Sequence, residues 1–574
     1  MTCDEKSIAT IEDAHAALLQ GDYPRSEKLY REILNNEPED VRALDGLGIL
    51  LCQKGETEQG IPLFEEALRI LRAESPPNSQ WEASILFHLG LSCRTLGRQH
   101  DALRFFDEAA AHTPHDYEIV LNLGQVHFEL EQYEQTVKCF QELTGIKPED
   151  VSAWLTLGYV LTILDRNGEA AEVLKRAESL DPASPEICFY LAESLRKEEQ
   201  FEESLPHYQR MLQIGAEYPQ AVHGYGKALL ALGNLEDGWD AMEFRFASSF
   251  GSWERHSLTN WTPDITGASR VLAYSEESIG ADLMFASCLP DLINSVEHCV
   301  VECESSLHAL FRRSFPRAQF VPLADDYVRP EGNSWGIQLD TQIAFGSLPR
   351  YFRRSIDDFP LRKAYLVPDR DLVDRWSTRL ASLGDGKKIG LLWNGTWTDE
   401  TSKQTSLPLQ EVHRLLTRQS EAAWICLQHG SRQNDMNQQP YREVAPRIFS
   451  EAFRYDLDTM AALLTALDLV ITPPGYVAHL AGALGVRTWL LVPSGADWRH
   501  SIDVVSQVRS VWHPTVKMYR QTKGQTWQNF FAVIEDDIKQ FLTTHRPPEE
   551  MPATLNFTEQ KGMAPFRTSR PKAA

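Results

Sequence analysis

The first part of the chain carries hydrophobic and small positions that recur at a fixed interval. Leu-Gly, Leu-Ala and Tyr-Gly dipeptides mark one point of this pattern at 89–90, 123–124, 157–158, 191–192 and 225–226, in steps of 34 residues. An earlier Leu-Gly at 47–48 is 42 residues before the first of these, and the excess falls in "ILRAESPPNSQ". Alanine, phenylalanine and proline keep the same phase, which predicts helix pairs packed through small and aromatic side chains.

A period of 34 residues is typical of the tetratricopeptide repeat (TPR), a helix–turn–helix unit. We expect about seven repeats over residues 8–246, stacked as an α-solenoid. The concave face of such a solenoid binds an extended peptide or a partner helix, so the array predicts a protein partner. The alternative is that the repeats only cap the next domain or form dimers.

From residue 270 onward, short apolar runs alternate with helical patterns. The runs "RVLAYS", "HCVVEC" and "AQFVPL" predict strands, and "RDLVDRWSTRLASLG" predicts a closing helix. A second series starts at "KKIGLLWNG" and ends with the helix "WQNFFAVIEDDIKQFL". This order predicts two consecutive Rossmann-like α/β domains, 270–384 and 385–545, with ligands bound in the cleft between their carboxyl strand ends.

Composition narrows the class of protein. The 574 residues carry a formal net charge of −25, which argues against nucleic acid as a partner. The sequence has no secretory signal and no apolar run of 18 residues, so we expect a cytoplasmic protein without a membrane span. Cysteine spacing predicts no metal site. Residues 247–269 are predicted to be a linker, and the Pro-rich segment 546–574 a flexible tail.

Several motifs then appear in one order: "ESIGADLMFASCLPDL", "GSLPRYFRRS", "DLDTMAALLTALDLVI", "HLAGALG" and "VWHPTVKMYRQ". With the repeat array in front, the chain resembles bacterial TPR-containing glycosyltransferases, and its C-terminal half is similar to family-nine, heptosyltransferase-like enzymes of the GT-B fold. The resemblance implies a metal-independent transfer from a nucleotide-sugar, bound mainly by the second sheet domain, with no further cofactor.

The candidate donor-binding residues follow predicted strands of the second sheet domain. Gly475 opens the helix that carries "HLAGALG", and the N–H groups of a helix start favour a diphosphate. The other candidates are Asn394, Gly395, Thr396, Lys403, Ser406, Gln428 and His429. Lys403 would neutralise the leaving diphosphate, although a solvated loop lysine is an equal interpretation. His479, one turn into the helix, matches the family motif and is a candidate catalytic residue.

Two positions depart from the family pattern. In "EESIGA", Ala281 stands where the resemblance implies an aspartate that activates the acceptor hydroxyl, and adjacent Asp282 is the fallback base. In "ITPPGY", Pro474 and Gly475 replace an expected Asp-Thr or Asp-Ser pair. Two hypotheses remain: a glycosyltransferase acting on a protein or glycan recruited by the repeats, or a catalytically degenerate transferase fold that serves as a TPR scaffold.

Overall fold

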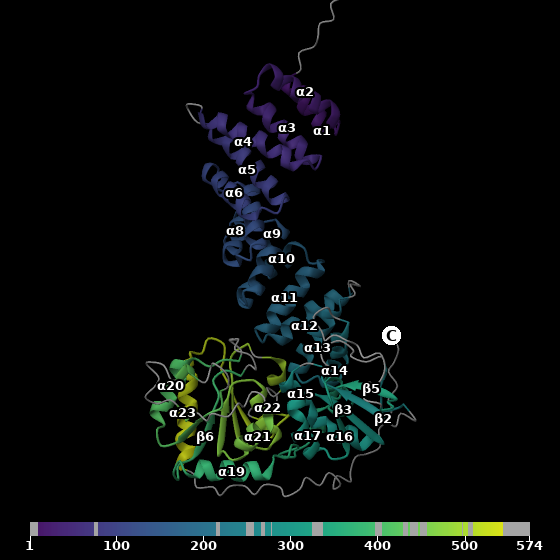
Figure 1. The fold of residues 1–574 in the computed structure, drawn as a ribbon, viewed down its shortest axis with the longest axis vertical. Coiled ribbons are helices and arrows are strands. Elements are labelled where there is room, and N and C mark those ends of the chain that lie inside the picture. The colour runs from purple at the N-terminus through teal and green to yellow at the C-terminus, as the bar shows by residue number, and fades with distance from the viewer. Residues whose placement is uncertain are drawn as a thin grey trace, which may run out of the picture. The chain divides into compact units, whose positions relative to one another are not determined.

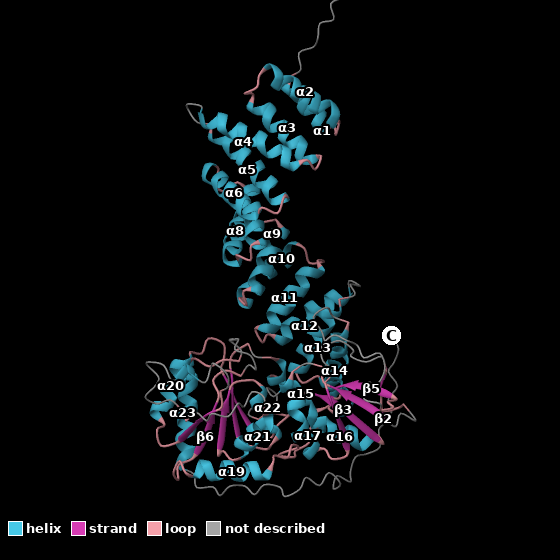
Figure 2. Ribbon diagram, viewed as in Figure 1, coloured by secondary structure: helices cyan, strands magenta, loops and turns pink. Residues whose placement is uncertain are grey.

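The computed structural model forms two compact units, Met1–Leu195 and Arg196–Ala574. The residues that it describes are 10–73, 78–213, 218–247, 258–265, 270–276, 278–323, 337–395, 405–428, 434–436, 446–447, 456–495, 497–502 and 509–543. The first unit is helical, and the second contains the last helices of the repeat array together with two parallel sheets (Figures 1 and 2).

The array consists of helices that follow one another along the chain. They are α1 (Ile11–Leu19), α2 (Tyr23–Asn36), α3 (Val41–Gln53), α4 (Thr57–Ala73), α5 (Ser79–Thr95), α6 (Gln99–His112), α7 (Tyr117–Glu129), α8 (Tyr133–Ile146), α9 (Val151–Ile163), α10 (Asn167–Leu180), α11 (Pro185–Lys197), α12 (Phe201–Gln213), α13 (Pro219–Ala231) and α14 (Leu235–Met242). A 3-10 turn, η1 (Glu243–Phe246), follows α14.

The recurring glycines are explained by close packing between the two helices of a pair. A Cβ atom on Gly90 would lie 2.5 Å from the ring of Phe106, and one on Gly124 would lie 2.9 Å from Phe140. Such distances leave no room for a side chain, so glycine lets the aromatic ring fill the space between the helices. This confirms the predicted roles of the small and aromatic positions.

The turn between the two helices of a pair also repeats. Gly97, Glu131, Asp165, Glu199 and Gly233, spaced by 34 residues, all have positive φ angles between 56° and 79°. This left-handed conformation suits glycine and costs a residue with a Cβ about 1–2 kcal/mol. The three acidic residues therefore occupy positions where the backbone would prefer glycine.

The first sheet is parallel, with strand order β1-β5-β2-β3-β4. Its strands are β1 (Thr259–Asn260), β2 (Arg270–Tyr274), β3 (His298–Cys303), β4 (Ala318–Pro322) and β5 (Thr341–Ala344). The helical segments around it are α15 (Ile279–Phe285), η2 (Ala286–Cys288), α16 (Leu289–Ser295), η3 (Ser305–Leu307), α17 (His308–Ser314), η4 (Phe345–Ser347), α18 (Pro349–Phe352), η5 (Ile356–Asp358) and α19 (Arg370–Ala381).

The second sheet is also parallel, with strand order β10-β9-β8-β6-β7. Its strands are β6 (Lys388–Leu391), β7 (Ala423–Cys426), β8 (Leu469–Thr472), β9 (Thr488–Val492) and β10 (Val516–Arg520). The helical segments are α20 (Leu409–Arg418), α21 (Leu457–Thr465), α22 (Tyr476–Ala483), η8 (Trp498–His500) and α23 (Trp527–Thr543). The predicted parallel sheets are thus present, and α23 packs its apolar face into the core of the second sheet.

Hydrogen bonds of Tyr365 and Leu366 link helix α15, beside the first sheet, with helix α22, beside the second. The backbone N–H groups of Tyr365 and Leu366 both donate to the carbonyl of Ala483, at 2.9 and 3.0 Å. The Tyr365 hydroxyl donates to the carbonyl of Leu283 at 2.6 Å. Helices α15 and α22 pack so closely that a Cβ on Gly280 would lie 3.4 Å from the Cα of Tyr476.

Three strands were not predicted from the sequence. Part of the expected linker forms β1, because Thr259 and Asn260 pair with β5 and Trp261 is buried against Tyr351 and Phe352. Strands β5 and β10 also complete the sheets. Among the helices that the structure describes, none is long and apolar enough to span a membrane.

Candidate functional site

Gln428 ties together the carboxyl ends of two strands of the second sheet. Its side-chain oxygen accepts the N–H of Asn394 at 3.1 Å, and its side-chain nitrogen donates to the Asn394 carbonyl at 3.2 Å. Both residues are 1% exposed. Gln428 therefore holds the backbone of the segment after β6 in place, and its amide is already used by protein groups.

Gly395 and Gly475 lie backbone against backbone. A Cβ on Gly475 would be 2.1 Å from the carbonyl oxygen of Gly395, and a Cβ on Gly395 would be 1.9 Å from that of Pro474. The two glycines allow the loop after β6 to reach the start of α22. The helix start that we expected to face a diphosphate is thus contacted by the Gly395 carbonyl.

The remaining donor candidates divide between described and undescribed residues. Ser406 forms an isolated antiparallel bridge with Asn394, and its hydroxyl has no hydrogen-bond partner. Thr396, Lys403 and His429 lie outside the described residues. The structure therefore brings Asn394, Gly395, Ser406, Gln428 and Gly475 to one edge of the sheet.

His479 belongs to a group of three buried histidines. Its Nδ1 lies 3.2 Å from Nε2 of His513, and its ring stacks on that of His500 with centroids 6.0 Å apart. Burial lowers the pKa of His500 to about 4 and that of His513 to about 3, and it lowers the pKa of His479 well below its usual value. The imidazoles are therefore neutral at physiological pH.

Asp282 lies in α15, beside the carboxyl end of β2. Its side chain is 1% exposed and accepts a hydrogen bond from the Ser275 hydroxyl at 2.5 Å. Neighbouring Ala281 is also buried, at 6% exposure. The carboxylate thus faces the protein interior, and its role as a base stays a prediction.

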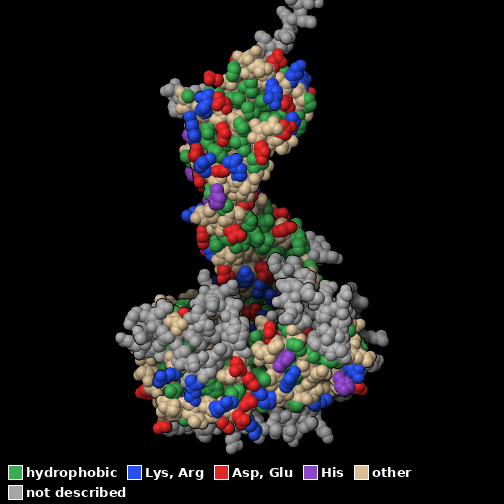
Figure 3. All heavy atoms as spheres, viewed as in Figure 1, with side chains coloured by type: hydrophobic (Ala, Val, Ile, Leu, Met, Phe, Trp, Pro, Cys, Tyr) green, Lys and Arg blue, Asp and Glu red, His purple; other side chains and the backbone are tan. Residues whose placement is uncertain are grey.

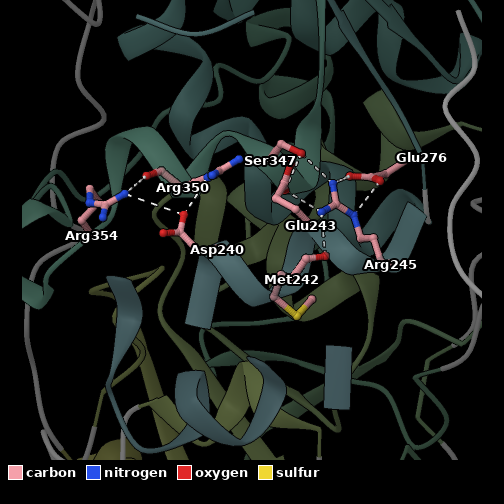
Figure 4. Close-up of polar contacts among 8 residues, drawn as sticks. All are labelled: Asp240, Met242, Glu243, Arg245, Glu276, Ser347, Arg350 and Arg354. Atoms are coloured by element: carbon pink, nitrogen blue, oxygen red, sulfur yellow. Dashed lines mark hydrogen bonds and ion pairs between the residues drawn. The ribbon is translucent and has the colours of Figure 1, made fainter. Parts of the chain in front are cut away.

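The carboxyl edge of the first sheet holds a buried ionic cluster that sequence reasoning missed (Figure 4). The Arg245 guanidinium, from η1, donates to both carboxylate oxygens of Glu276, at 2.9 and 2.8 Å. It also donates to Glu243 at 2.8 Å and to the Ser347 hydroxyl at 2.7 Å. Burial alone would lower the pKa of Arg245, but Glu276 and Glu243 raise it, so the arginine stays charged.

This cluster fixes the end of the repeat array to the first sheet domain. The N–H of Gly346, in η4, donates to Glu276 at 2.7 Å. Beside the cluster, Arg350 pairs with Asp240 at 2.7 Å, and the Trp239 indole donates to the Arg353 carbonyl at 2.8 Å. The last repeat helix, α14, therefore contacts the segment that follows β5 of the first sheet. No local sequence signal connects Arg245 with Glu276 and Ser347, which lie 31 and 102 positions further along the chain.

The array carries a face of half-exposed aromatic rings on the first helices of successive pairs. Phe128 in α7 contacts Tyr159 in α9 with ring centroids 6.0 Å apart, and Tyr159 contacts Tyr190 in α11 at 5.0 Å. A second set, at 34-residue spacing and also half-exposed, comprises Phe87, Leu121, Leu155 and Phe189. Figure 3 shows hydrophobic side chains gathered in patches on the visible face of the array.

Comparisons with known proteins identify the repeat. TPR family models match residues 39–113, 96–158 and 151–184, so this part of the chain is a TPR array. Protein FlbA of Caulobacter vibrioides is 23% identical and is matched over 91% of this chain and 94% of its own length.

Other relatives share shorter regions. The human cell division cycle protein 16 homolog is 24% identical over 25% of this chain and 24% of its own length. Human protein O-mannosyl-transferase TMTC1 is 24% identical over 31% of this chain and 20% of its own length. Among solved structures, YrrB, a TPR protein with an unusual peptide-binding site, has a TM-score of 0.31 and 18% identity over 34% of this chain and 96% of its own.

Proposed function

We propose that this protein binds a segment of a partner protein through its TPR array, and that its two sheet domains form the platform to which the array is fixed. The observation that carries this proposal is the ring series Phe128–Tyr159–Tyr190 together with the 34-residue apolar set. These side chains are half-exposed on consecutive first helices, where a bound segment would contact several repeats at once.

The test compares two tyrosine variants of the full chain. Partners captured by the protein are identified by mass spectrometry, purified and titrated by calorimetry. We expect Tyr159→Ser to weaken binding at least about tenfold, because aromatic residues at the centre of an interface carry much of its affinity. The matched control is Tyr218→Ser, an exposed tyrosine outside the series. Equal affinities for the two variants would contradict the proposal.

A second candidate function is transfer of a sugar from a nucleotide-sugar to the bound partner. The arrangement at the second sheet favours it: Asn394, Gln428 and Gly475 meet at the carboxyl edge of a parallel sheet, where this class of fold binds ligands. The helix start at Gly475 has no acidic residue in its first turn, so its N–H groups suit a diphosphate. This function requires the loop that contains Gly395 to move, so that its carbonyl no longer contacts the start of α22.

Transfer is tested with a panel of nucleotide-sugars and the purified partner, with mass spectrometry of the products. Asp282→Asn should abolish transfer if Asp282 becomes the base, whereas Ser275→Ala removes only its hydrogen-bond donor and should leave transfer measurable. An unchanged rate for Asp282→Asn excludes that residue as the base. The absence of any product or donor hydrolysis across the panel leaves the binding function alone.

A further inference from the structure

The turn after β9 holds a carboxylate on its backbone. The N–H of Gly495, a residue with φ of +81°, donates to the side chain of Glu199 at 2.7 Å. The preceding N–H, of Ser494, donates to the Gln521 side chain at 3.4 Å. Successive N–H groups in a turn form a concave anion-binding feature, and here the anion is supplied by the chain itself.

Glu199 comes from the turn between α11 and α12, at one of the left-handed positions of the array. Gly97 and Gly233 serve the same position in other repeats without strain, so the backbone does not require a glutamate. The adjacent Glu198 forms an ion pair with the exposed Lys523 at 2.7 Å and does not contact Gly495 in the hydrogen bonds of this turn. The carboxylate of Glu199 is thus placed on Gly495 at the expense of local backbone strain.

Charged side chains of both signs lie in and around η8, which follows this turn in the chain. Arg499 pairs with Asp497 at 3.0 Å, and α13, which carries Lys227, packs against η8. Burial alone would raise the pKa of Asp497, but Arg499, His500 and Lys227 lower it. The positive charge of Arg520, at the end of β10, contributes to lowering the pKa of His500. The positive charges of Arg499 and Lys227 thus act on the carboxylate of Asp497, two residues after Gly495.

We propose that the Ser494–Gly495 turn binds a phosphate oxygen of a diphosphate-bearing ligand and that Glu199 occupies the turn until the ligand displaces it. The proposal rests on the second candidate function, which supplies the ligand class. A carboxylate oxygen and a phosphate oxygen accept the same N–H, so they compete for it. Because Glu199 belongs to the repeat array, a partner that moves the α11–α12 turn changes ligand affinity, and the ligand acts back on the partner equally.

The experiment titrates uridine diphosphate and inorganic pyrophosphate into the full-length protein by calorimetry. Glu199→Gln keeps the size of the side chain and removes its charge, and Glu199→Gly also removes the backbone strain. We expect both variants to bind at least about tenfold more tightly than the wild type, since a hydrogen bond to a charged group no longer competes. Glu198→Gln is the matched control and should stay within about twofold.

The outcomes distinguish the displacement of Glu199 from nucleotide binding as such. If the wild type binds uridine diphosphate or pyrophosphate and both Glu199 variants bind equally well, the displacement proposal is wrong while nucleotide binding stands. If neither the wild type nor any variant binds either compound, both the proposal and the transferase function fail. Tighter binding that is confined to the Glu199 variants supports the proposal, and tighter binding in Glu198→Gln as well contradicts it, because general charge removal would then explain the effect.

Discussion

Replacing Arg245 with methionine should destabilise the Arg196–Ala574 unit strongly. The side chain is 1% exposed and donates hydrogen bonds to Glu276, Glu243, Ser347 and the Met242 carbonyl. Without it, the Glu276 carboxylate, itself 1% exposed, keeps the Gly346 N–H as a donor and loses its countercharge.

The loss in the free energy of unfolding depends on the charged group that remains buried, which here is the Glu276 carboxylate. Removing one partner of a buried ion pair costs about 3–5 kcal/mol, because the remaining charge has been taken out of water without compensation. Replacing both partners by apolar residues is often neutral. Arg245→Met should therefore lower the free energy of unfolding by about 3–5 kcal/mol, and Arg245→Met/Glu276→Met should recover most of that loss.

The assay is urea-induced unfolding followed by tryptophan fluorescence, with the transition of the unit that contains Trp239 and Trp261 analysed separately from that of the first unit. Arg350→Met is the matched control: it also breaks an arginine pair, with Asp240, but this arginine side chain is 36% exposed, so the loss should be below about 1 kcal/mol. A loss below about 1 kcal/mol for Arg245→Met, or a double variant less stable than the single one, would refute the reasoning.

Three further predictions concern stability. Gly475→Ala should lower the free energy of unfolding by about 1–3 kcal/mol, because its methyl group would overlap the Gly395 carbonyl, whereas Gly145→Ala, with open space around it, should be neutral or stabilising in the same denaturation assay. Glu131→Gly should raise the free energy of unfolding of the first unit by about 1 kcal/mol, because glycine adopts the positive φ of 58° without strain; a thermal midpoint below that of the wild type contradicts this. The folded pKa values of His500 and His513, about 4 and 3, lie below the unfolded value of about 6.5. The stability that these two neutral histidines contribute is complete above about pH 6.5. It falls by about 1.4 kcal/mol per pH unit and per histidine as the pH drops from about 6.5 toward the folded pKa values. The free energies of unfolding measured with urea at about pH 7.5 and 5.5 should therefore differ less for His513→Asn than for the wild type.

The repeat array could be predicted because its determinants are local. Gly90 and Phe106 are sixteen residues apart and belong to one helix pair, so the spacing of the sequence already encodes their contact. The same holds for β2, β3 and β9, whose apolar runs coincide with the observed strands. Strand β10 carries two basic residues, Lys517 and Arg520, at its less buried positions, which explains why the sequence pattern did not reveal it as a strand.

The candidate site depended on contacts that no spacing shows. Asp282 was chosen as a base for its position next to Ala281, but the direction of its side chain is set by the hydrogen bond from Ser275. Gly475 was correctly placed at the start of α22, whereas the arrival of the Gly395 carbonyl there depends on how two strands are joined. The Arg245 cluster draws on three distant segments and became visible only in three dimensions.

The carbonyl of Ala483 accepts hydrogen bonds from the N–H groups of Tyr365 and Leu366. These two bonds restrict hinge motion of the segment between the two sheets. Moving the two sheets apart would break both hydrogen bonds at once. We therefore expect a ligand at the carboxyl strand ends to bind by rearrangement of loops, without a change in the distance between the sheets. Small-angle X-ray scattering profiles recorded with and without nucleotide should therefore superimpose, and any cooperativity between partner and nucleotide would have to travel through side chains and turns.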